Sequence, residues 1–152
     1  MLQIGDDAPD FSLLNQAGDT VSLSALRGRK VFLFAYPKAA TPGCTTQACG
    51  FRDHFADLTT NDDTVILGIS PDEPKKLASW KEKESLPYDL LSDPEHEVLD
   101  AYGAWGEKSM YGRKYMGVIR SHFVIGEDGK LLDVQIKISP KKSIEKAVKF
   151  LG

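Results

Sequence analysis

The fold of this 152-residue chain is decided by residues 31–44, which read VFLFAYPKAATPGC. The first six side chains form an uninterrupted apolar run, which is typical of a central strand covered on both faces of its sheet. Pro37 ends the run, and Thr41-Pro42 then suits a helix start, with Thr41 at the N-cap and Pro42 at the first helical position. The stretch therefore predicts a buried strand that leads directly into a helix.

After this helix start, apolar residues recur at helical spacing. They stand at offsets of 0, 4, 7, 11 and 14, namely Cys44, Ala48, Phe51, Phe55 and Leu58. At about 100° per residue they share one narrow stripe, which we expect to face the core. A second strand of the buried type follows at residues 64–69, so strand, helix and strand predict a βαβ unit with a right-handed crossover.

Outward from this unit, the patterns predict the rest of an α/β sandwich. We expect an N-terminal β-hairpin at 11–14 and 20–23, a helix at 74–84, a strand at 88–91, a short helix at 95–102, a hairpin at 121–125 and 131–138, and a last helix that starts at Ser139-Pro140. Residues 103–118 show no clear period, and we interpret them as a loop. The order predicts three layers, with a central mixed β-sheet flanked by helices.

Composition excludes several classes of protein. The chain has no internal repeat and no linker, so we expect a single domain over residues 1–152. The longest apolar run, 31–36, is far shorter than the ~20 residues of a membrane span, and the N-terminus lacks the pattern of an export signal. The net charge of −3, with both signs interspersed, argues against a nucleic-acid partner. We therefore expect a cytoplasmic protein that binds neither membrane nor nucleic acid.

The chain has two cysteines, Cys44 and Cys49, which are too few and too close for a secreted disulfide scaffold. Cys44 falls just beyond the carboxyl end of the predicted central strand, where open α/β sheets bind their ligands. Unpaired N–H groups and the helix dipole at that point favour a thiolate, the nucleophilic form of cysteine. A reactive Cys44 fits this position, and so does a cysteine that simply packs on the apolar stripe.

Residues 36–53, YPKAATPGCTTQACGFRD, resemble the active-site segment of the peroxiredoxins, in particular the bacterioferritin comigratory protein or peroxiredoxin Q subfamily. Pro37, Thr41 and Cys44 match the family pattern Pro-x-x-x-Thr/Ser-x-x-Cys, and Cys49 matches the second cysteine that the subfamily often has five residues later. Further matches follow in order over most of the chain: Gly68-Ile69-Ser70-Pro71-Asp72, Leu91-Ser92-Asp93, Trp105-Gly106-Glu107-Lys108, Arg120-Ser121-His122-Phe123-Val124-Ile125 and Asp128-Gly129.

The resemblance implies a thioredoxin-like fold and a thiol peroxidase that reduces hydrogen peroxide and organic hydroperoxides in antioxidant defence. It implies no cofactor and no metal, and a thioredoxin-type dithiol as the reductant; we expect a monomer. By the family pattern, Cys44 would be the peroxidatic cysteine. Cys49 would resolve the sulfenic acid of Cys44 as an intramolecular disulfide.

The resemblance also implies roles for the residues around the sulfur. Thr41 would place its hydroxyl against the thiolate and the peroxide, and Pro37 would shield the sulfur from water. Arg120 would stabilise the thiolate and the leaving oxygen, and the backbone N–H groups of Gly43 and Cys44 would complete the donor set. These roles agree with general chemistry, because cleavage of a peroxide O–O bond needs an anionic nucleophile and donors aimed at the leaving oxygen.

The sequence by itself does not bring Arg120 to Cys44, because 76 positions separate them. Four other arginines compete for the same role: Arg27, Arg29, Arg52 and Arg113. Gln47 stands where many relatives have Glu, and its carbonyl oxygen remains able to accept a hydrogen bond from a guanidinium.

Other functions of the two cysteines fit the sequence less well than the peroxidase. A thioredoxin-fold copper-binding module would use Cys44 and Cys49, with His122 as a third ligand, but residues five apart on a helix point roughly 140° apart. A dithiol–disulfide oxidoreductase would have Cys-x-x-Cys, which is absent. Inert cysteines leave the Pro37, Thr41 and Cys44 pattern unexplained. The sequence therefore favours the peroxidase.

Overall fold

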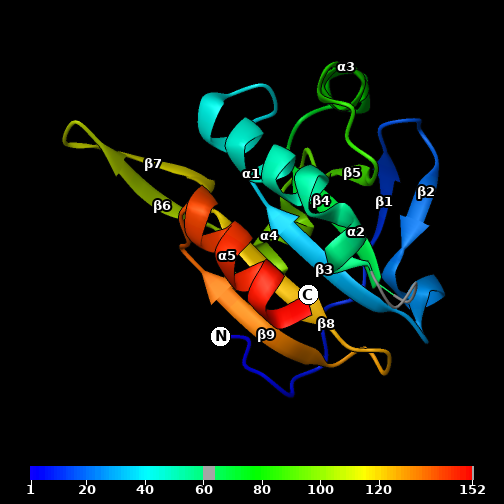
Figure 1. Cartoon of the computed structure of the whole chain (residues 1–152). Helices are drawn as coiled ribbons and strands as arrows, with labels where there is room; N and C mark the ends of the chain where they lie inside the picture. The colour runs from blue at the N-terminus through cyan, green and yellow to red at the C-terminus, as the bar shows by residue number, and fades with distance from the viewer. Residues whose placement is uncertain (60–63, 152) are drawn as a thin grey trace.

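A seven-stranded mixed sheet with strand order β2-β1-β5-β4-β3-β8-β9 forms the centre of the structure (Figure 1). The structure is a computed structural model that describes residues 1–59 and 64–151. The strands of the sheet are β1 (Ser12–Asn15), β2 (Thr20–Ser22), β3 (Lys30–Ala35), β4 (Thr64–Ser70), β5 (Asp89–Ser92), β8 (Ser121–Ile125) and β9 (Leu131–Ile136). The helices are η1 (Leu23–Leu26), α1 (Pro42–Asp53), α2 (Phe55–Leu58), α3 (Pro74–Glu84), α4 (Glu97–Ala101) and α5 (Pro140–Leu151).

The predicted apolar strand, β3, lies inside the sheet. It runs parallel to β4 and antiparallel to β8, and its residues 31–35 are all buried. Helices α1 and α2 connect β3 to β4, and α3 connects β4 to the parallel strand β5. The carboxyl ends of these three strands therefore meet at one edge of the sheet, which is where α1 begins.

The two faces of the sheet are covered by different elements, so the predicted three layers are present. Phe32 and Phe34 of β3 pack in a cluster with residues of α1, α3 and α5, and Figure 1 shows α1 and α5 across this face. Val31 and Leu33 point to the other face and pack in a second cluster, which includes Tyr102 just after α4. Alternation along β3 thus buries both of its faces.

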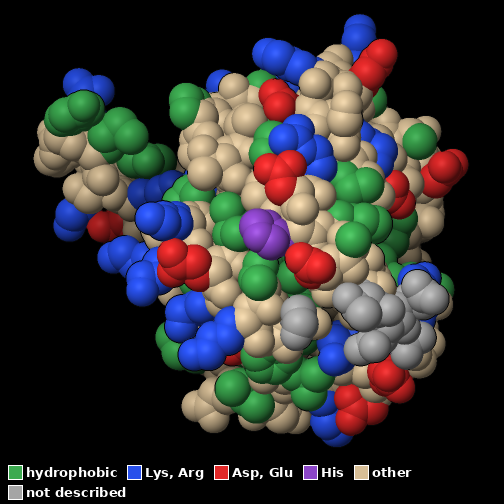
Figure 2. Space-filling model, viewed as in Figure 1, with side chains coloured by type: hydrophobic (Ala, Val, Ile, Leu, Met, Phe, Trp, Pro, Cys, Tyr) green, Lys and Arg blue, Asp and Glu red, His purple; other side chains and the backbone are tan. Residues whose placement is uncertain are grey.

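Residues 103–118 do not form the loop that we expected from the sequence. Trp105–Met110 (β6) and Arg113–Val118 (β7) pair as an antiparallel hairpin. Its turn residues Tyr111 and Gly112 have φ of 52° and 78°, as a type I′ turn requires. The hairpin projects from the body of the protein, with exposed hydrophobic side chains near its tip (Figure 2). Only the base of the hairpin reaches the core, through Val118 and the half-buried Trp105. The rest has no buried face that requires apolar–polar alternation, and the sequence therefore shows no strand period.

The predicted apolar stripe spans two helices instead of one. Helix α1 ends at Asp53 and α2 begins at Phe55. Between them, His54 leaves helical geometry with φ −104° and ψ 13°, and its ring Nδ1–H donates to the Gly50 carbonyl at 3.0 Å. Phe55 and Leu58 still pack against the same core cluster as α1. The prediction of a buried apolar face is therefore confirmed, whereas the prediction of one continuous helix is wrong.

Helix α5 is the last helix, which we expected to start at Ser139-Pro140, and it is amphipathic. Ala147 is fully buried, while Ile144, Val148 and Leu151 pack against the core. Its lysines are exposed, and Ser143 is fully buried. Within the two described ranges, no helix combines the length and apolar character that crossing a membrane requires.

Candidate active site

Cys44 lies in the first turn of α1, at the carboxyl edge of the sheet, and its side chain is 1% exposed. Thr41 occupies the N-cap position with extended dihedral angles, and Pro42 begins the helix. The N–H groups of Gly43 and Cys44 belong to the first turn, where no preceding helical carbonyl accepts them. These donors and the helix dipole favour an anion beside the sulfur.

Arg120 reaches Cys44 in spite of their distance in sequence. It directly precedes β8, whose antiparallel pairing with β3 brings it beside the carboxyl end of that strand. Its Nη2 donates to Cys44 Sγ at 3.3 Å, and its Nη1 donates to Gln47 Oε1 at 2.6 Å. A Cβ atom at Gly43 would lie 3.3 Å from Nη2, so the missing side chain there permits this close approach. The guanidinium is thus held between the Cys44 sulfur and the Gln47 side-chain amide, both of which belong to α1.

The four competing arginines lie elsewhere. Arg52 and Arg27 each donate to a backbone carbonyl at 2.7 Å, of Glu84 and Asp128 respectively. Arg29 precedes the amino end of β3, and Arg113 is exposed on β7.

The two cysteines, both free thiols, have opposite hydrogen-bonding roles. The Cys49 thiol donates to Glu84 Oε2 of α3 at 3.4 Å. Burial raises the pKa of Cys49, and so does the hydrogen bond to Glu84, while the charge of Arg52 acts in the opposite direction. Cys49 is therefore a protonated donor at neutral pH, whereas Cys44 accepts a hydrogen bond from a cation. The geometry suits Cys44, not Cys49, to be the nucleophile.

The loop between β3 and α1 is anchored by Asp72, which accepts a hydrogen bond from the Ala39 N–H at 2.7 Å. Pro37 begins the loop and is half-buried. The Thr41 side chain makes no capping hydrogen bond, although the residue was expected as the N-cap. Its hydroxyl instead donates to the Lys38 carbonyl at 2.7 Å, which leaves the oxygen free to accept from another group.

A pocket of about 660 Å³ opens beside Arg120. The residues that line it are Glu107, Lys108, Ser109, Ile119, Arg120, Lys137, Ile138 and Ser139. Lys108 donates to the Val118 carbonyl at 2.8 Å. Burial lowers the pKa of Lys108, as does the charge of Arg120, and Cys44 opposes both. The pocket thus combines cationic side chains with apolar surface beside the arginine that contacts the Cys44 sulfur.

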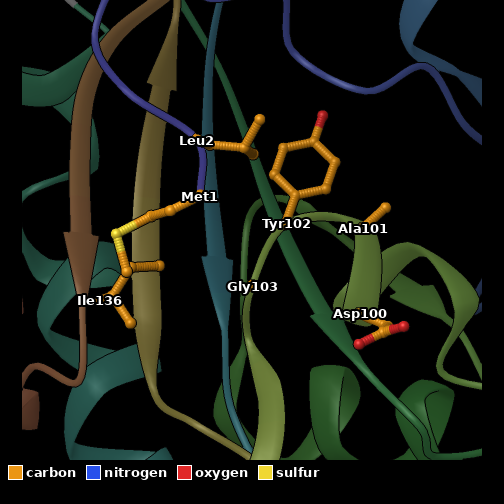
Figure 3. A pocket seen from close by; sticks show the side chains of 7 residues that line it. All are labelled: Met1, Leu2, Asp100, Ala101, Tyr102, Gly103 and Ile136. Atoms are coloured by element: carbon orange, nitrogen blue, oxygen red, sulfur yellow. The ribbon is translucent and has the colours of Figure 1, made fainter.

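A second pocket, of about 370 Å³, lies against α4 and the N-terminal segment (Figure 3). It is lined by Met1, Leu2, Asp100, Ala101, Tyr102, Gly103 and Ile136, none of which belongs to the site around Cys44. Trp105 stacks on His96 with ring centroids 3.9 Å apart and packs on the core of this face. This side of the sheet contributes packing and not site residues.

The geometry gives the metal-site alternative no support. Cys44 and Cys49 bond to different partners, Arg120 and Glu84, and the His122 ring bonds to Ser143. Within residues 1–59 and 64–151, no cluster of three or more His, Cys, Asp or Glu side chains could hold a metal ion.

Asp72 and Ser143 were not singled out from the sequence. Asp72 could have been found, because it follows β4, whose carboxyl end lies beside that of β3. Ser143 carries no such signal, since a lone serine on a helix is ordinarily a surface residue.

Known proteins with similar sequences and structures are peroxiredoxins. The family model described as AhpC/TSA matches residues 4–134. Peroxiredoxin Bcp of Escherichia coli K12 is 48% identical over 130 residues, which cover 86% of this chain and 83% of that protein. Peroxidoxin BcpB of Mycobacterium tuberculosis is 37% identical, with a TM-score of 0.85 over 99% of this chain and 97% of that one. The bacterioferritin comigratory protein of Xanthomonas campestris, solved in a study of its alkyl peroxide reduction activity, is 26% identical, with a TM-score of 0.88 over 99% of this chain and 96% of that one.

Proposed function

The chain belongs to the AhpC/TSA family and is a peroxiredoxin of the Bcp type with a thioredoxin-like fold, and from this premise we propose that Cys44 reduces hydrogen peroxide and organic hydroperoxides. The observation that supports this role best is the contact between Arg120 Nη2 and the buried Cys44 Sγ, 3.3 Å apart at a helix N-terminus. A cation and free N–H groups together stabilise a thiolate in a site that otherwise excludes water.

In the proposed reaction, the Cys44 thiolate attacks the terminal oxygen of the hydroperoxide. The S–O bond forms as the O–O bond breaks, so that the sulfur is oxidised to a sulfenic acid and the peroxide is reduced. The leaving alkoxide or hydroxide takes a proton from water and departs as an alcohol or as water. Arg120 and the N–H groups of Gly43 and Cys44 donate to the oxygens on which the negative charge develops.

Thr41 and the pocket orient the substrate in this proposal. Because the hydroxyl hydrogen of Thr41 is bound to the Lys38 carbonyl, its oxygen accepts the O–H of the peroxide. Pro37 limits the access of water to the sulfur. The substituent of an organic hydroperoxide lies in the pocket beside Arg120, against Ile119 and Ile138.

Cys49 completes the proposed cycle. Its thiol attacks the Cys44 sulfenic acid, water leaves, and an intramolecular disulfide forms. A thioredoxin-type dithiol then reduces the disulfide by thiol–disulfide exchange. A reductant of this kind suits a reducing compartment such as the cytoplasm.

One equivalent of hydrogen peroxide, added to the reduced protein, should lower its mass by two hydrogens. In Cys49→Ser the sulfenic acid has no thiol partner, so that variant should gain one oxygen and be open to further oxidation at excess peroxide. Intact-mass spectrometry, with dimedone to trap the sulfenic acid, measures both products. An unreactive wild-type protein would overturn the peroxidase, and normal turnover of Cys49→Ser with thioredoxin would overturn the resolving role alone.

Formation of the Cys44–Cys49 disulfide should require α1 to unwind. Both residues lie on this helix, where positions i and i+5 have Cα atoms about 8.6 Å apart, beyond the ~7 Å limit for a disulfide. Unwinding also breaks the hydrogen bonds that Cys49 and Arg52 make to Glu84. Helix ends open at modest free-energy cost, so the oxidised protein should be locally unfolded from about residue 41 to 52.

Amide hydrogen exchange, followed in both redox states, tests this opening. Exchange over residues 41–52 should accelerate sharply on oxidation, while β3 stays protected because its hydrogen bonds lie inside the sheet. The Cys49→Ser variant is the matched control, since peroxide cannot close its disulfide. Equal protection of residues 41–52 in the reduced and oxidised wild type would contradict the prediction.

A further inference from the structure

A chain of buried polar side chains runs inward from Arg120, away from the sulfur. Arg120 Nη1 donates to Gln47 Oε1 at 2.6 Å, and Gln47 Nε2 donates to Ser143 Oγ at 3.0 Å. Ser143 Oγ lies 2.8 Å from His122 Nδ1. Gln47, Ser143 and His122 come from α1, α5 and β8, and each side chain is fully buried. Three separate elements thus supply one continuous network that ends on the guanidinium.

The directions of the first two hydrogen bonds in this chain follow from its arginine end. A guanidinium only donates, so Gln47 must present its carbonyl oxygen to Arg120 and its NH₂ group to Ser143. The Ser143 oxygen accepts that bond and has a second lone pair, so its bond to His122 Nδ1 could run in either direction. Because the Asp133 carboxylate lies 3.7 Å from Nε2, we assign the ring hydrogen to Nε2, and Ser143 then donates to Nδ1. His122 is neutral in this arrangement.

The surroundings of His122 favour this neutral form. Burial lowers the pKa of His122 to about 4, and Lys146 of α5 contributes in the same direction, whereas Asp133 of β9 opposes both. The Nε2 atom lies 3.7 Å from Asp133 Oδ2, beyond hydrogen-bonding distance, and has no hydrogen-bond partner in the described part of the chain. A buried donor without a hydrogen-bond partner is destabilising, so the ring is anchored through its other nitrogen, by the 2.8 Å contact with Ser143.

We propose that His122 and Ser143 are positioning residues for the peroxide step, which hold the Gln47 amide in the orientation that keeps the Arg120 guanidinium on the Cys44 sulfur. This inference rests on the proposed role of Arg120. Without His122, the Ser143 hydroxyl loses the group that fixes its orientation. Without Ser143, the Gln47 NH₂ group loses its hydrogen-bond partner. In both cases the Gln47 amide is free to rotate. The guanidinium then loses the acceptor that sets its position.

His122→Leu and Ser143→Ala test the proposal, since each removes one partner at little change in volume. Stopped-flow oxidation by peroxide should be about two- to tenfold slower in each variant, the effect expected for one hydrogen bond. The thiolate titration of Cys44, followed by absorbance near 240 nm, should move to higher pH. His122→Asn should restore the rate, because its Oδ1 takes the place of Nδ1 as the acceptor.

A control variant separates positioning from general loss of stability. Tyr102→Phe deletes a partly buried hydrogen bond, from the tyrosine hydroxyl to the Pro9 carbonyl, on the opposite face of the sheet. It should lower the melting temperature without changing the peroxide rate or the thiolate titration. Rates and titrations of His122→Leu and Ser143→Ala within the error of wild type would overturn the proposal.

The same substitutions in an Arg120→Met background distinguish this inference from the proposed function. If the network acts through Arg120, the effects of His122→Leu and Ser143→Ala should disappear there. Undiminished effects in that background would overturn the positioning role. If Arg120→Met alone changed nothing, the proposed role of Arg120 would have failed first.

The wild-type protein offers a test that needs no variant. Nitrogen-15 NMR of the histidine rings at neutral pH should show the His122 hydrogen on Nε2, with Nδ1 unprotonated. A hydrogen on Nδ1 would reverse the last bond of the chain and overturn the donor order on which the proposal depends.

Discussion

Cys44→Ser should abolish peroxide reduction, lowering the second-order rate constant by about 10³-fold or more. A serine hydroxyl remains protonated at neutral pH, so neither Arg120 nor the helix N-terminus can turn it into an anion. The side chain is 1% exposed and packs in the core cluster under α1, and the substitution is small enough to keep this packing. Peroxide consumption in the presence of a dithiol reductant measures the loss, and circular dichroism verifies the fold.

Cys49→Ser provides the matched control for this prediction. It makes the same sulfur-to-oxygen replacement five positions further along the helix. It should keep the first oxidation step, because the Cys49 thiol is a protonated donor to Glu84 and does not face Arg120. If Cys44→Ser still consumed peroxide at a tenth of the wild-type rate, the nucleophile would have been assigned wrongly.

Arg120→Met should slow oxidation of Cys44 by about 10²-fold and shift its thiolate titration to higher pH. Methionine preserves much of the side-chain volume but removes both the positive charge and the donor that lies 3.3 Å from Sγ. The charge stabilises the thiolate before the reaction, and the donors stabilise the leaving oxygen during it. Both the thiolate titration and the oxidation rate at a pH where Cys44 is fully ionised should therefore change.

Arg27→Met is the control for the loss of an arginine. Arg27 donates to the Asp128 carbonyl, far from the sulfur in the fold, so the rate and the thiolate titration should equal those of the wild type. A normal rate and titration in Arg120→Met would show that the 3.3 Å contact does not contribute to the reaction. The proposed mechanism would then lose the cation that stabilises the thiolate and the leaving oxygen.

Features with a local physical cause could be predicted from the sequence alone. The apolar run at 31–36 has to be covered on both faces, and β3 is indeed an interior strand. Pro74 and Glu84 were the expected ends of a helix, and α3 has these ends. The resemblance of residues 36–53 to peroxiredoxins, which the comparisons confirm, likewise depends on neighbouring residues. Periodicity and helix-start signals act within a few residues, and the sequence displays them directly.

The site, in contrast, is assembled by contacts between distant segments, which depend on strand register and helix packing. Arg120 is chosen over four other arginines because β8 pairs with β3 in antiparallel orientation. Ser143 joins the site because α5 packs across α1. The β6–β7 hairpin is buried only at its base and has no continuous buried face to impose a pattern, so its strands became visible only in the structure. The sequence by itself determined the strand–helix segment around Cys44 and its family. The tertiary structure decided which distant side chains surround the sulfur, because that choice follows from long-range pairing that no local pattern encodes.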